Sequence, residues 1–435
     1  MTRVRFSRRP LELAMILAAT GLPMGAQAAS DSERLAALEA QLKQQQQELI
    51  RLKQTARANA PKFSPDVSLI LSGNLTRYSG DEGAIDHTNG FAPEQEGNEE
   101  GLSIGHTEFV LSGNIDTQFY GQFIAAFHDH DGEVETEIED ASITNTPFSG
   151  ATLKAGRYLS EFGYNNEHHE HAWDISTAPL AYRYIFGGSL TDDGLQVNYI
   201  TPTDTFVKVG GEALSGRGDP ATASDRIGAY TAYLNVGGDV DQRTSWLLGA
   251  SHYRGDADER DLVGEHAHEH EGDAEHEASF SGETRVSGVE LVLKHAPTGN
   301  MKARHFKLQA EYLRAKSSGD VALTEPGLPT EETVYSDDRD GYYVLASWQW
   351  APQWRTSIRH DVFESDLVGD ADILQDLEQL DSARAEQLSA AIDWMGSEFS
   401  RVRLQYSKDR VPGDEREALL LNYTVSLGAH GAHKY

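Results

Sequence analysis

From Val67 onward, apolar and polar side chains alternate with a period of two. Near the start of this region Leu69 and Leu71 alternate with serines. Near its end Leu421, Tyr423 and Val425 alternate with Asn422, Thr424 and Ser426. Such alternation predicts strands with one apolar face and one polar face. Sixteen segments follow it, near 67–78, 103–116, 117–129, 134–145, 151–158, 193–200, 204–214, 226–238, 242–254, 284–296, 303–316, 339–351, 354–365, 384–395, 399–410 and 416–428.

The connections between these segments alternate between short and long. Short turns are expected at 116–117, 146–150, 201–204, 237–243, 297–302, 351–353 and 396–398. Long loops are expected at 79–102, 159–192, 215–225, 255–283, 317–338 and 366–383, with short exceptions at 129–133 and 411–415. An even strand number with this alternation is typical of bacterial outer-membrane barrels, which have short periplasmic turns and longer extracellular loops. We therefore predict an all-β chain that forms a transmembrane antiparallel β-barrel of about 16 strands, with a soluble all-β protein as the alternative.

The N-terminal part of the chain has a different pattern. Residues 1–28 combine an arginine-rich start, an apolar stretch and the small-residue triplet Ala26-Gln27-Ala28, which together predict a secretory signal peptide. Residues 29–57 follow a heptad pattern that predicts a short α-helical coiled coil, with a single helix lying on another surface as the alternative. Its seam is Leu35, Leu38, Leu42, Leu49 and Leu52. Residues 58–66 are a proline-containing linker, and 67–435 form the barrel.

Composition narrows the class of protein. The 435 residues carry a net charge of −32 and no cysteine. The negative charge argues against nucleic acid as a partner, because binding of phosphates requires Lys and Arg. After the N-terminus no apolar run is long enough for a helical membrane span. The absence of cysteine excludes disulfides and thiolate metal sites.

Three features resemble a known family. They are the leucine seam at 35–52, Gly156-Arg157 followed by Phe162-Gly163, and the terminal aromatic residue Tyr435. With the strand pattern, they make the chain similar to bacterial outer-membrane porins that carry an N-terminal coiled coil, and in architecture it resembles the phosphate-selective porin group. The resemblance implies a homotrimer in outer-membrane lipid and lipopolysaccharide, with the coiled coils in the periplasm. The chain departs from the pattern at Gly431 and His433, where alternate apolar residues would precede the terminal aromatic.

Most of the negative charge lies in four predicted loops. Loops 79–102, 255–283, 317–338 and 366–383 hold 30 carboxylates and one basic residue, Arg260. Such a mouth would attract cations and repel anions, which differs from phosphate selectivity. The alternative is that these loops are solvated, or bind the divalent ions that bridge lipopolysaccharide phosphates.

Five basic residues are expected to line the pore. Each one alternates with apolar neighbours along a predicted strand, so it faces the lumen if the apolar set faces lipid. They are Lys307, Arg355, Arg359, Arg401 and Arg403. A basic wall of this kind is common in general porins, and it keeps anion permeation as an alternative.

Histidine and glutamate gather in two loops. In 159–192, the loop expected to fold into the pore, the predicted metal ligands are His168, His169 and His171, with Glu167 and Glu170 as pore-lining neighbours. In 255–283 the predicted ligands are Glu265, His266, His268, Glu269, His270 and His276. Imidazole and carboxylate together suit zinc and similar divalent ions. The alternative for the first group is a constriction lining without metal, and His128 with His130 is a third candidate group.

These patterns lead to one functional hypothesis. The chain is expected to be a channel in the bacterial outer membrane whose acidic, histidine-rich loops attract and pass divalent metal, zinc first, with no cofactor required beyond Zn²⁺ bound in the loops. The main rival is a general or anion-selective porin that passes small solutes, in which the histidines are incidental. An energised receptor is less favoured, because only the coiled coil and linker precede Val67. An enzyme is not expected, because Gly-x-Ser-x-Gly and His-Glu-x-x-His motifs are absent.

Overall fold

The computed structural model describes residues 65–79, 100–130, 133–223, 226–261, 277–324, 329–369, 382–411 and 414–428. The signal peptide, the coiled coil and all but the end of the linker lie outside these residues. So do Tyr435 and the predicted ligands Glu265, His266, His268, Glu269, His270 and His276. Among the described residues, no helix is long and apolar enough to cross a membrane.

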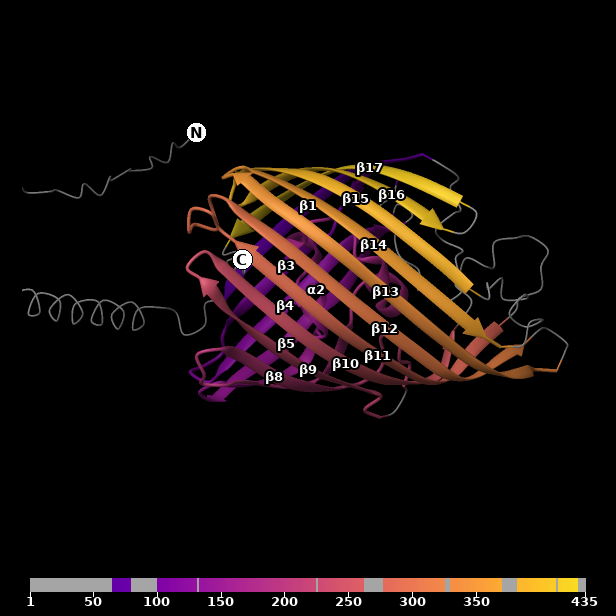
Figure 1. Cartoon of the computed structure of the whole chain (residues 1–435). Helices are drawn as coiled ribbons and strands as arrows, with labels where there is room; N and C mark the ends of the chain where they lie inside the picture. The colour runs from indigo at the N-terminus through magenta and orange to yellow at the C-terminus, as the bar shows by residue number, and fades with distance from the viewer. Residues whose placement is uncertain are drawn as a thin grey trace, which may run out of the picture. The chain divides into compact units, whose positions relative to one another are not determined.

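One antiparallel sheet closes on itself, because β1 pairs with β17 on one side and with β2 and β3 on the other (Figure 1). Since β2 and β3 are two halves of one barrel strand, the barrel has 16 strands, as predicted. The strands are β1 Asp66–Ser79, β2 Gly101–Ile104, β3 Thr107–Asn114, β4 Phe119–His130, β5 Glu133–Phe148, β6 Ala151–Leu159, β7 Thr191–Ile200, β8 Phe206–Leu214, β9 Ala229–Asp241, β10 Thr244–Asp261, β11 Glu277–His295, β12 His305–Thr324, β13 Glu331–Ala351, β14 Trp354–Val368, β15 Ser382–Ser397, β16 Ser400–Val411 and β17 Asp414–Gly428.

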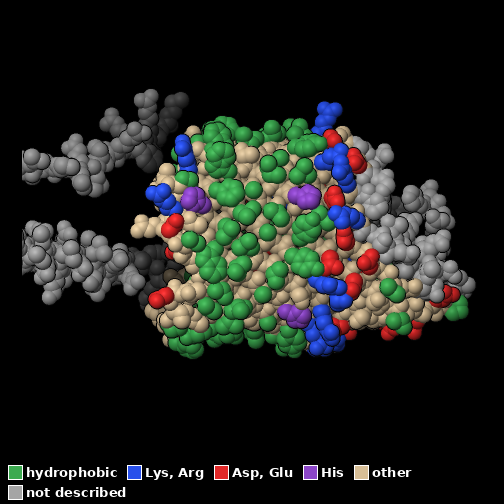
Figure 2. Space-filling view, in the orientation of Figure 1, with side chains coloured by type: hydrophobic (Ala, Val, Ile, Leu, Met, Phe, Trp, Pro, Cys, Tyr) green, Lys and Arg blue, Asp and Glu red, His purple; other side chains and the backbone are tan. Residues whose placement is uncertain are grey.

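The two faces of the barrel differ in chemistry. Side chains such as Leu195, Trp348 and Tyr423 are more than half exposed on the outside, whereas Asn74 and Gln309 are buried on the inside. A band of apolar side chains covers the outer wall, and charged side chains gather at its edges (Figure 2). This arrangement satisfies the backbone within the sheet and presents apolar groups to lipid.

Two hairpins extend well beyond the predicted strand ends. β10 and β11 extend through residues 255–261 and 277–283 of the loop predicted at 255–283, and β12 and β13 through residues 317–324 and 331–338 of the one predicted at 317–338. The prediction of irregular loops there is therefore wrong outside their tips. The cause is a second apolar cluster under the extensions, which includes Phe280, Val321, Tyr335 and Leu367.

The loop after β6 enters the barrel. We call residues 160–190 the inward loop. It contains α2 Gly163–Asn166, the 3-10 turn η1 Glu170–Ala172 and α3 Leu180–Phe186. Six of the seven α3 residues are buried, and α3 packs against β12, β13, β14 and β15, while α2 packs against β10 and β11. The helix ends at Gly187, whose φ of 66° lets Gly187 and Gly188 donate to the carbonyls of Arg183 and Tyr182.

The barrel wall opposite α3 is irregular at two points. Along β1, Gly73 pairs with Ile104 and Ile70 with Glu108, so the β2–β3 strand has one extra residue beside His106. Along β4, Ile124 pairs with Asp140 but its neighbour Ala125 pairs with Ile138, which leaves Glu139 without a partner of its own. Both irregularities are β-bulges, which redirect side chains without ending the strand.

Candidate functional site

The lumen is divided into two vestibules. The first opens toward the short turns, has a volume of about 600 Å³ and includes Met301 and Phe399 in its lining. The second opens toward the long loops, has a volume of about 530 Å³ and includes Tyr78 and Arg416. Both are lined by Leu159, His168, His169 and Trp173. The four shared residues therefore mark the partition between the vestibules, and they belong to the end of β6 and to the inward loop.

The vestibules differ in charge. The long-loop vestibule is lined by five carboxylates and two arginines, which are Glu135, Glu137, Glu139, Glu170, Asp409, Arg183 and Arg416. In the short-turn vestibule six carboxylates face six basic residues, which are Glu108, Asp140, Glu161, Glu167, Asp174, Glu398, Lys154, Lys294, Lys307, Arg355, Arg359 and Arg401. An acidic excess therefore lies on the long-loop side of the partition.

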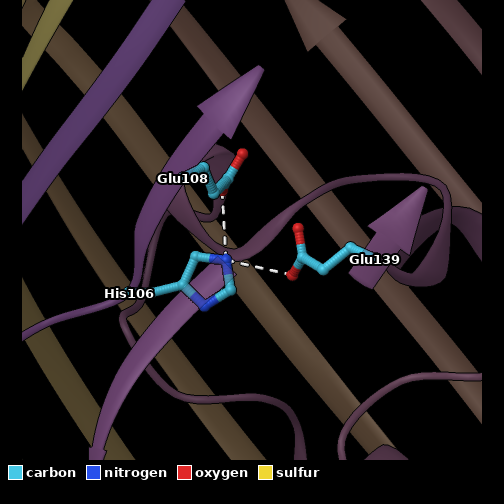
Figure 3. A group of neighbouring side chains, drawn as sticks. All are labelled: His106, Glu108 and Glu139. Carbon is cyan, nitrogen blue, oxygen red and sulfur yellow. Dashed lines mark ion pairs between the residues drawn. The ribbon is translucent and has the colours of Figure 1, made fainter. Parts of the chain in front are cut away.

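A group of histidine and glutamate side chains lies on the barrel wall beside this partition. His106 Nε2 is 3.1 Å from Glu108 Oε1 and 3.0 Å from Glu139 Oε1 (Figure 3). One ligand atom from each of the three residues lies within 4.8 Å of the other two. His106 and Glu139 reach this point because each lies at one of the two bulges.

The inward loop adds two more histidines to this group. His169 Nδ1 donates to Glu139 Oε2 at 2.9 Å, and His171 Nδ1 donates to Glu108 Oε1 at 2.5 Å. Burial alone would lower the pKa of His169, but the hydrogen bond to Glu139 and the charges of Glu108 and Glu139 outweigh it and raise the pKa. We call His106, Glu108, Glu139, His169 and His171 the wall–loop cluster.

The third predicted histidine of this loop, His168, makes its hydrogen bonds within the inward loop. His168 Nδ1 donates to the carbonyl of Tyr164 at 2.8 Å, and the indole of Trp173 donates to the His168 carbonyl. His168 thus shapes the inward loop from within, while still lining both vestibules. His128, on β4, packs its ring 4.9 Å from that of His106.

The two predicted pore-lining glutamates, Glu167 and Glu170, contact different parts of the barrel wall. Glu170 Oε2 lies 3.5 Å from His106 Nδ1, at the edge of the wall–loop cluster. Glu167 accepts from Lys208 Nζ at 2.8 Å, on the opposite side of the inward loop, where Lys208 also pairs with Glu161.

Three of the predicted basic residues bind the inward loop at Trp173 and Asp174. Asp174 is ion-paired with Lys307 at 2.5 Å and with Arg355 at 2.6 Å. Arg403 donates to the carbonyl of Trp173 at 2.8 Å. Burial would raise the pKa of Asp174, but the charges of Arg355 and Lys307 hold it well below its ordinary value. These side chains anchor the loop as well as facing the lumen.

The other two basic residues make further contacts with the same loop. Arg359 pairs with Asp361 at 2.7 Å and donates to the carbonyl of Thr177 at 2.6 Å. Arg401 donates to the carbonyl of Trp173 at 3.3 Å, and its Nε is buried without a hydrogen-bond partner. The basic wall therefore spans β12, β14 and β16 and faces the loop along its length.

Sequence reasoning missed His106, Glu108 and Glu139. The signal available was two sets of consecutive polar residues, His106-Thr107-Glu108 and Glu139-Asp140, which break the alternation within predicted strands. A bulge cannot be located from that signal alone, because the register of two strands defines it.

Comparisons with known proteins agree with the geometry at the level of fold. No family model matches the sequence. An uncharacterized protein of Aquifex aeolicus (strain VF5) is 25% identical over 404 residues, which cover 86% of this chain and 80% of the relative. A loop-deletion mutant of OmpT, an outer membrane protein of Vibrio cholerae, is similar in structure with a TM-score of 0.50 and 12% identity, over 84% of this chain and 99% of that one. The outer membrane channel DcaP of Acinetobacter baumannii has a TM-score of 0.48 and 12% identity, over 83% of this chain and 97% of that one.

The closed barrel, its apolar outer band and the OmpT similarity identify the class. The chain has the fold of the bacterial outer-membrane porins.

Proposed function

We propose that the barrel is an outer-membrane channel that passes divalent metal ions, above all zinc, along an acidic path that narrows at the wall–loop cluster. The observation that carries the proposal is the position of the cluster across the partition. His106 and Glu139 line the long-loop vestibule, Glu108 and His171 line the short-turn vestibule, and His169 lines both. An ion that crosses the partition therefore passes within reach of imidazole and carboxylate ligands.

The charge of the long-loop vestibule supports a preference for cations. Five carboxylates against two arginines attract cations through their summed field. The four acidic segments predicted as loops at this end, with 30 carboxylates and one base in the sequence, would strengthen that field. The ligands that a passing ion contacts at the partition must exchange it, because a site that holds a passing ion too tightly blocks conduction.

Zinc flux into liposomes tests the proposal. Purified protein is reconstituted with a zinc-sensitive dye inside the vesicles, and zinc entry is compared with potassium flux. Replacement of His169 and His171 by Gln should slow zinc entry more than potassium flux. The control is His252→Gln, an exposed histidine of β10. Equal zinc entry in the double variant and the wild type would contradict the proposal that zinc passes the partition at the wall–loop cluster.

A second part of the proposal is that the histidine-rich segment around His266 to His276 captures zinc before it enters the pore. A variant without residues 264–277 should bind zinc more weakly than the wild type in equilibrium dialysis. Equal affinity would remove the capture step and leave the constriction step standing.

A second candidate function is anion or general solute permeation. It is favoured by Lys294 and Arg401, which line the short-turn vestibule without a carboxylate bonded to either among the described residues. The reversal potential under a potassium chloride gradient separates the two functions. A cation preference supports the first proposal and an anion preference supports the second.

The assembly is also part of the proposal. We expect a homotrimer in outer-membrane lipid and lipopolysaccharide, with the coiled coil at 29–57 in the periplasm. Native mass spectrometry of the full chain and of a variant without residues 29–57 tests the trimer and its dependence on the coiled coil. A monomeric wild type would exclude the homotrimer.

A further inference from the structure

His106, Glu108 and Glu139 have the spacing of a metal centre. In a tetrahedral site with metal–ligand bonds of about 2.0–2.1 Å, two ligand atoms lie about 3.3 Å apart. The His106 nitrogen is 3.1 Å from one carboxylate oxygen and 3.0 Å from the other. All three side chains point into one small space, and they come from β3, from β5 and from the bulge that precedes β3 (Figure 3).

The polar atoms of this centre are not satisfied by the protein. Glu108 Oε2 is buried without a hydrogen-bond partner, and the ring nitrogens of His106 contact only carboxylate oxygens among the ion pairs of the described residues. The His106 side chain is 7% exposed and that of Glu108 is 0% exposed. The Nε2 atom of His106 lies 3.1 Å and 3.0 Å from two carboxylate oxygens, and its single N–H cannot satisfy both of them, which is costly for buried polar groups.

The charge of the centre is also incomplete. Among the described residues, no lysine or arginine forms an ion pair with Glu108 or Glu139, and their charged partners are imidazoles. Asp174, a buried carboxylate of the same lumen, has Lys307 and Arg355 instead. Two buried carboxylates without a strong cation favour a divalent ion between them.

We propose that His106, Glu108 and Glu139 hold one divalent transition-metal ion as a resident ion that regulates the channel. The inference rests on the proposed function in its choice of ion, and it adds that this ion stays bound while other cations pass. One nitrogen and two carboxylate oxygens suit zinc, whereas calcium and magnesium prefer ligand sets made of oxygen alone.

The resident ion acts on the inward loop through its two ligands. Glu139 accepts from His169 and Glu108 accepts from His171, so the carboxylates that bind the metal also bind the loop. A metal that fixes both carboxylates fixes the loop histidines against the wall, as outer-shell hydrogen bonds do in other metal sites. It also removes negative charge from the partition. Both effects lower the conductance for monovalent cations.

Single-channel recordings with and without zinc test the inference. In wild type, micromolar zinc should lower potassium conductance to a plateau, and a chelator should restore it. His106→Gln should weaken the zinc effect by roughly tenfold or more in concentration, since a single change in a metal centre commonly costs 10–100-fold in affinity. Glu139→Gln is the second variant, in case His106→Gln disturbs the bulge. His252→Gln is the matched control, and it should respond as the wild type does.

The visible absorption of bound cobalt distinguishes a metal ligand from a residue that only supports the fold. Cobalt-loaded wild type should show the intense visible absorption of a four-coordinate site, and His106→Gln should lose it while remaining a folded, heat-modifiable barrel. A wild type without this absorption, or a zinc effect that is equal in wild type and both variants, would overturn the inference.

The outcomes separate this inference from the proposed function. Zinc entry into liposomes together with a zinc effect independent of His106 would reject the resident ion and leave zinc passage standing. A zinc effect that depends on His106 without zinc entry would reject passage and leave the resident ion standing. A variant without residues 264–277 should keep the effect, because the centre lies entirely on the barrel wall.

Discussion

Glu139 and His106 come from strands that are not neighbours, yet their side chains meet at 3.0 Å. β4 lies between them in the sheet. The contact exists because Glu139 is the extra residue of the bulge in β5 and His106 lies in the bulge between β2 and β3. Two local irregularities of the wall thus produce one centre inside the lumen.

Deletion of Glu139 should restore regular pairing between β4 and β5 while removing the acceptor of His169. We expect a barrel that folds, because Ile138 and Asp140 keep their present partners Ala125 and Ile124. The zinc effect on potassium conductance should disappear. Heat modifiability on gels checks folding, and bilayer recordings check the zinc effect. Glu137→Gln, on the same strand, is the control and should leave the zinc effect in place.

Replacement of Asp174 by Asn should release the inward loop from the basic wall. The change leaves Lys307 and Arg355 without their partner in the loop, and breaking a buried ion pair costs roughly 3 kcal/mol or more. The midpoint of thermal unfolding should fall, and the reversal potential should shift toward anions. Asp338→Asn, which breaks exposed pairs with Lys316 and Arg314, should have little effect on either measurement. An unchanged reversal potential in the Asp174 variant would contradict the anchoring role.

The same carboxylate predicts a pH dependence with a definite sign. Arg355 and Lys307 hold the pKa of Asp174 well below its ordinary value, so the ion pairs stabilise the folded protein above the ordinary pKa of about 4. That stabilisation is lost as the pH falls from there toward the lowered pKa. Tryptophan emission, to which the neighbouring Trp173 contributes, should therefore stay constant from pH 7 to 5 and change only in stronger acid. The Asp174→Asn variant should lack this acid transition, and a wild-type transition between pH 7 and 5 that Asp174→Asn abolishes would contradict the prediction.

Gly163→Ala should displace α2 from its place in the lumen. Gly163 has a φ of 71°, and an added methyl group would meet the Tyr182 hydroxyl and the Glu311 carboxylate. We expect a loss of about 1–3 kcal/mol from strain and overpacking, measured by thermal unfolding, together with a changed conductance. Gly299→Ala is a matched control, because Gly299 has the same φ of 71° in a turn where an added Cβ would meet no neighbouring atom within 4 Å. A similar loss in both variants would attribute the effect to backbone strain alone.

The strands could be predicted from the sequence because lipid on one side and water on the other impose a period of two. Each of the sixteen predicted segments lies on a barrel strand. The ends of β10 to β13 were predicted too short, because the apolar residues Phe280 and Tyr335 of the extensions pack on each other above the barrel rather than against lipid. A period of two does not distinguish these two environments.

The candidate site was predictable only in part. His169 and His171 were predicted as metal ligands because histidines cluster in one loop. They are hydrogen-bonded to the wall carboxylates Glu139 and Glu108, and their role as ligands stays a prediction. Their partners on the wall were missed, because His106 and Glu139 depend on the register of β1 with β2–β3 and of β4 with β5. The basic residues were found by alternation, but their pairing with Asp174 depends on how the inward loop lies across the lumen. The histidine-rich segment at 265–276 lies outside the described residues and stays a prediction.

The inward loop bears on how the barrel assembles. It leaves the wall after β6, yet its helix α3 packs against β12 to β15 and Trp173 accepts from Arg403 of β16. The apolar residues of the loop are therefore buried only when strands made much later in the chain arrive. Contacts this distant in sequence are slow to form, so docking of the loop and closure of the seam between β1 and β17 become one late event. An unfinished barrel would expose the apolar side of α3 to water until the last strand is in place.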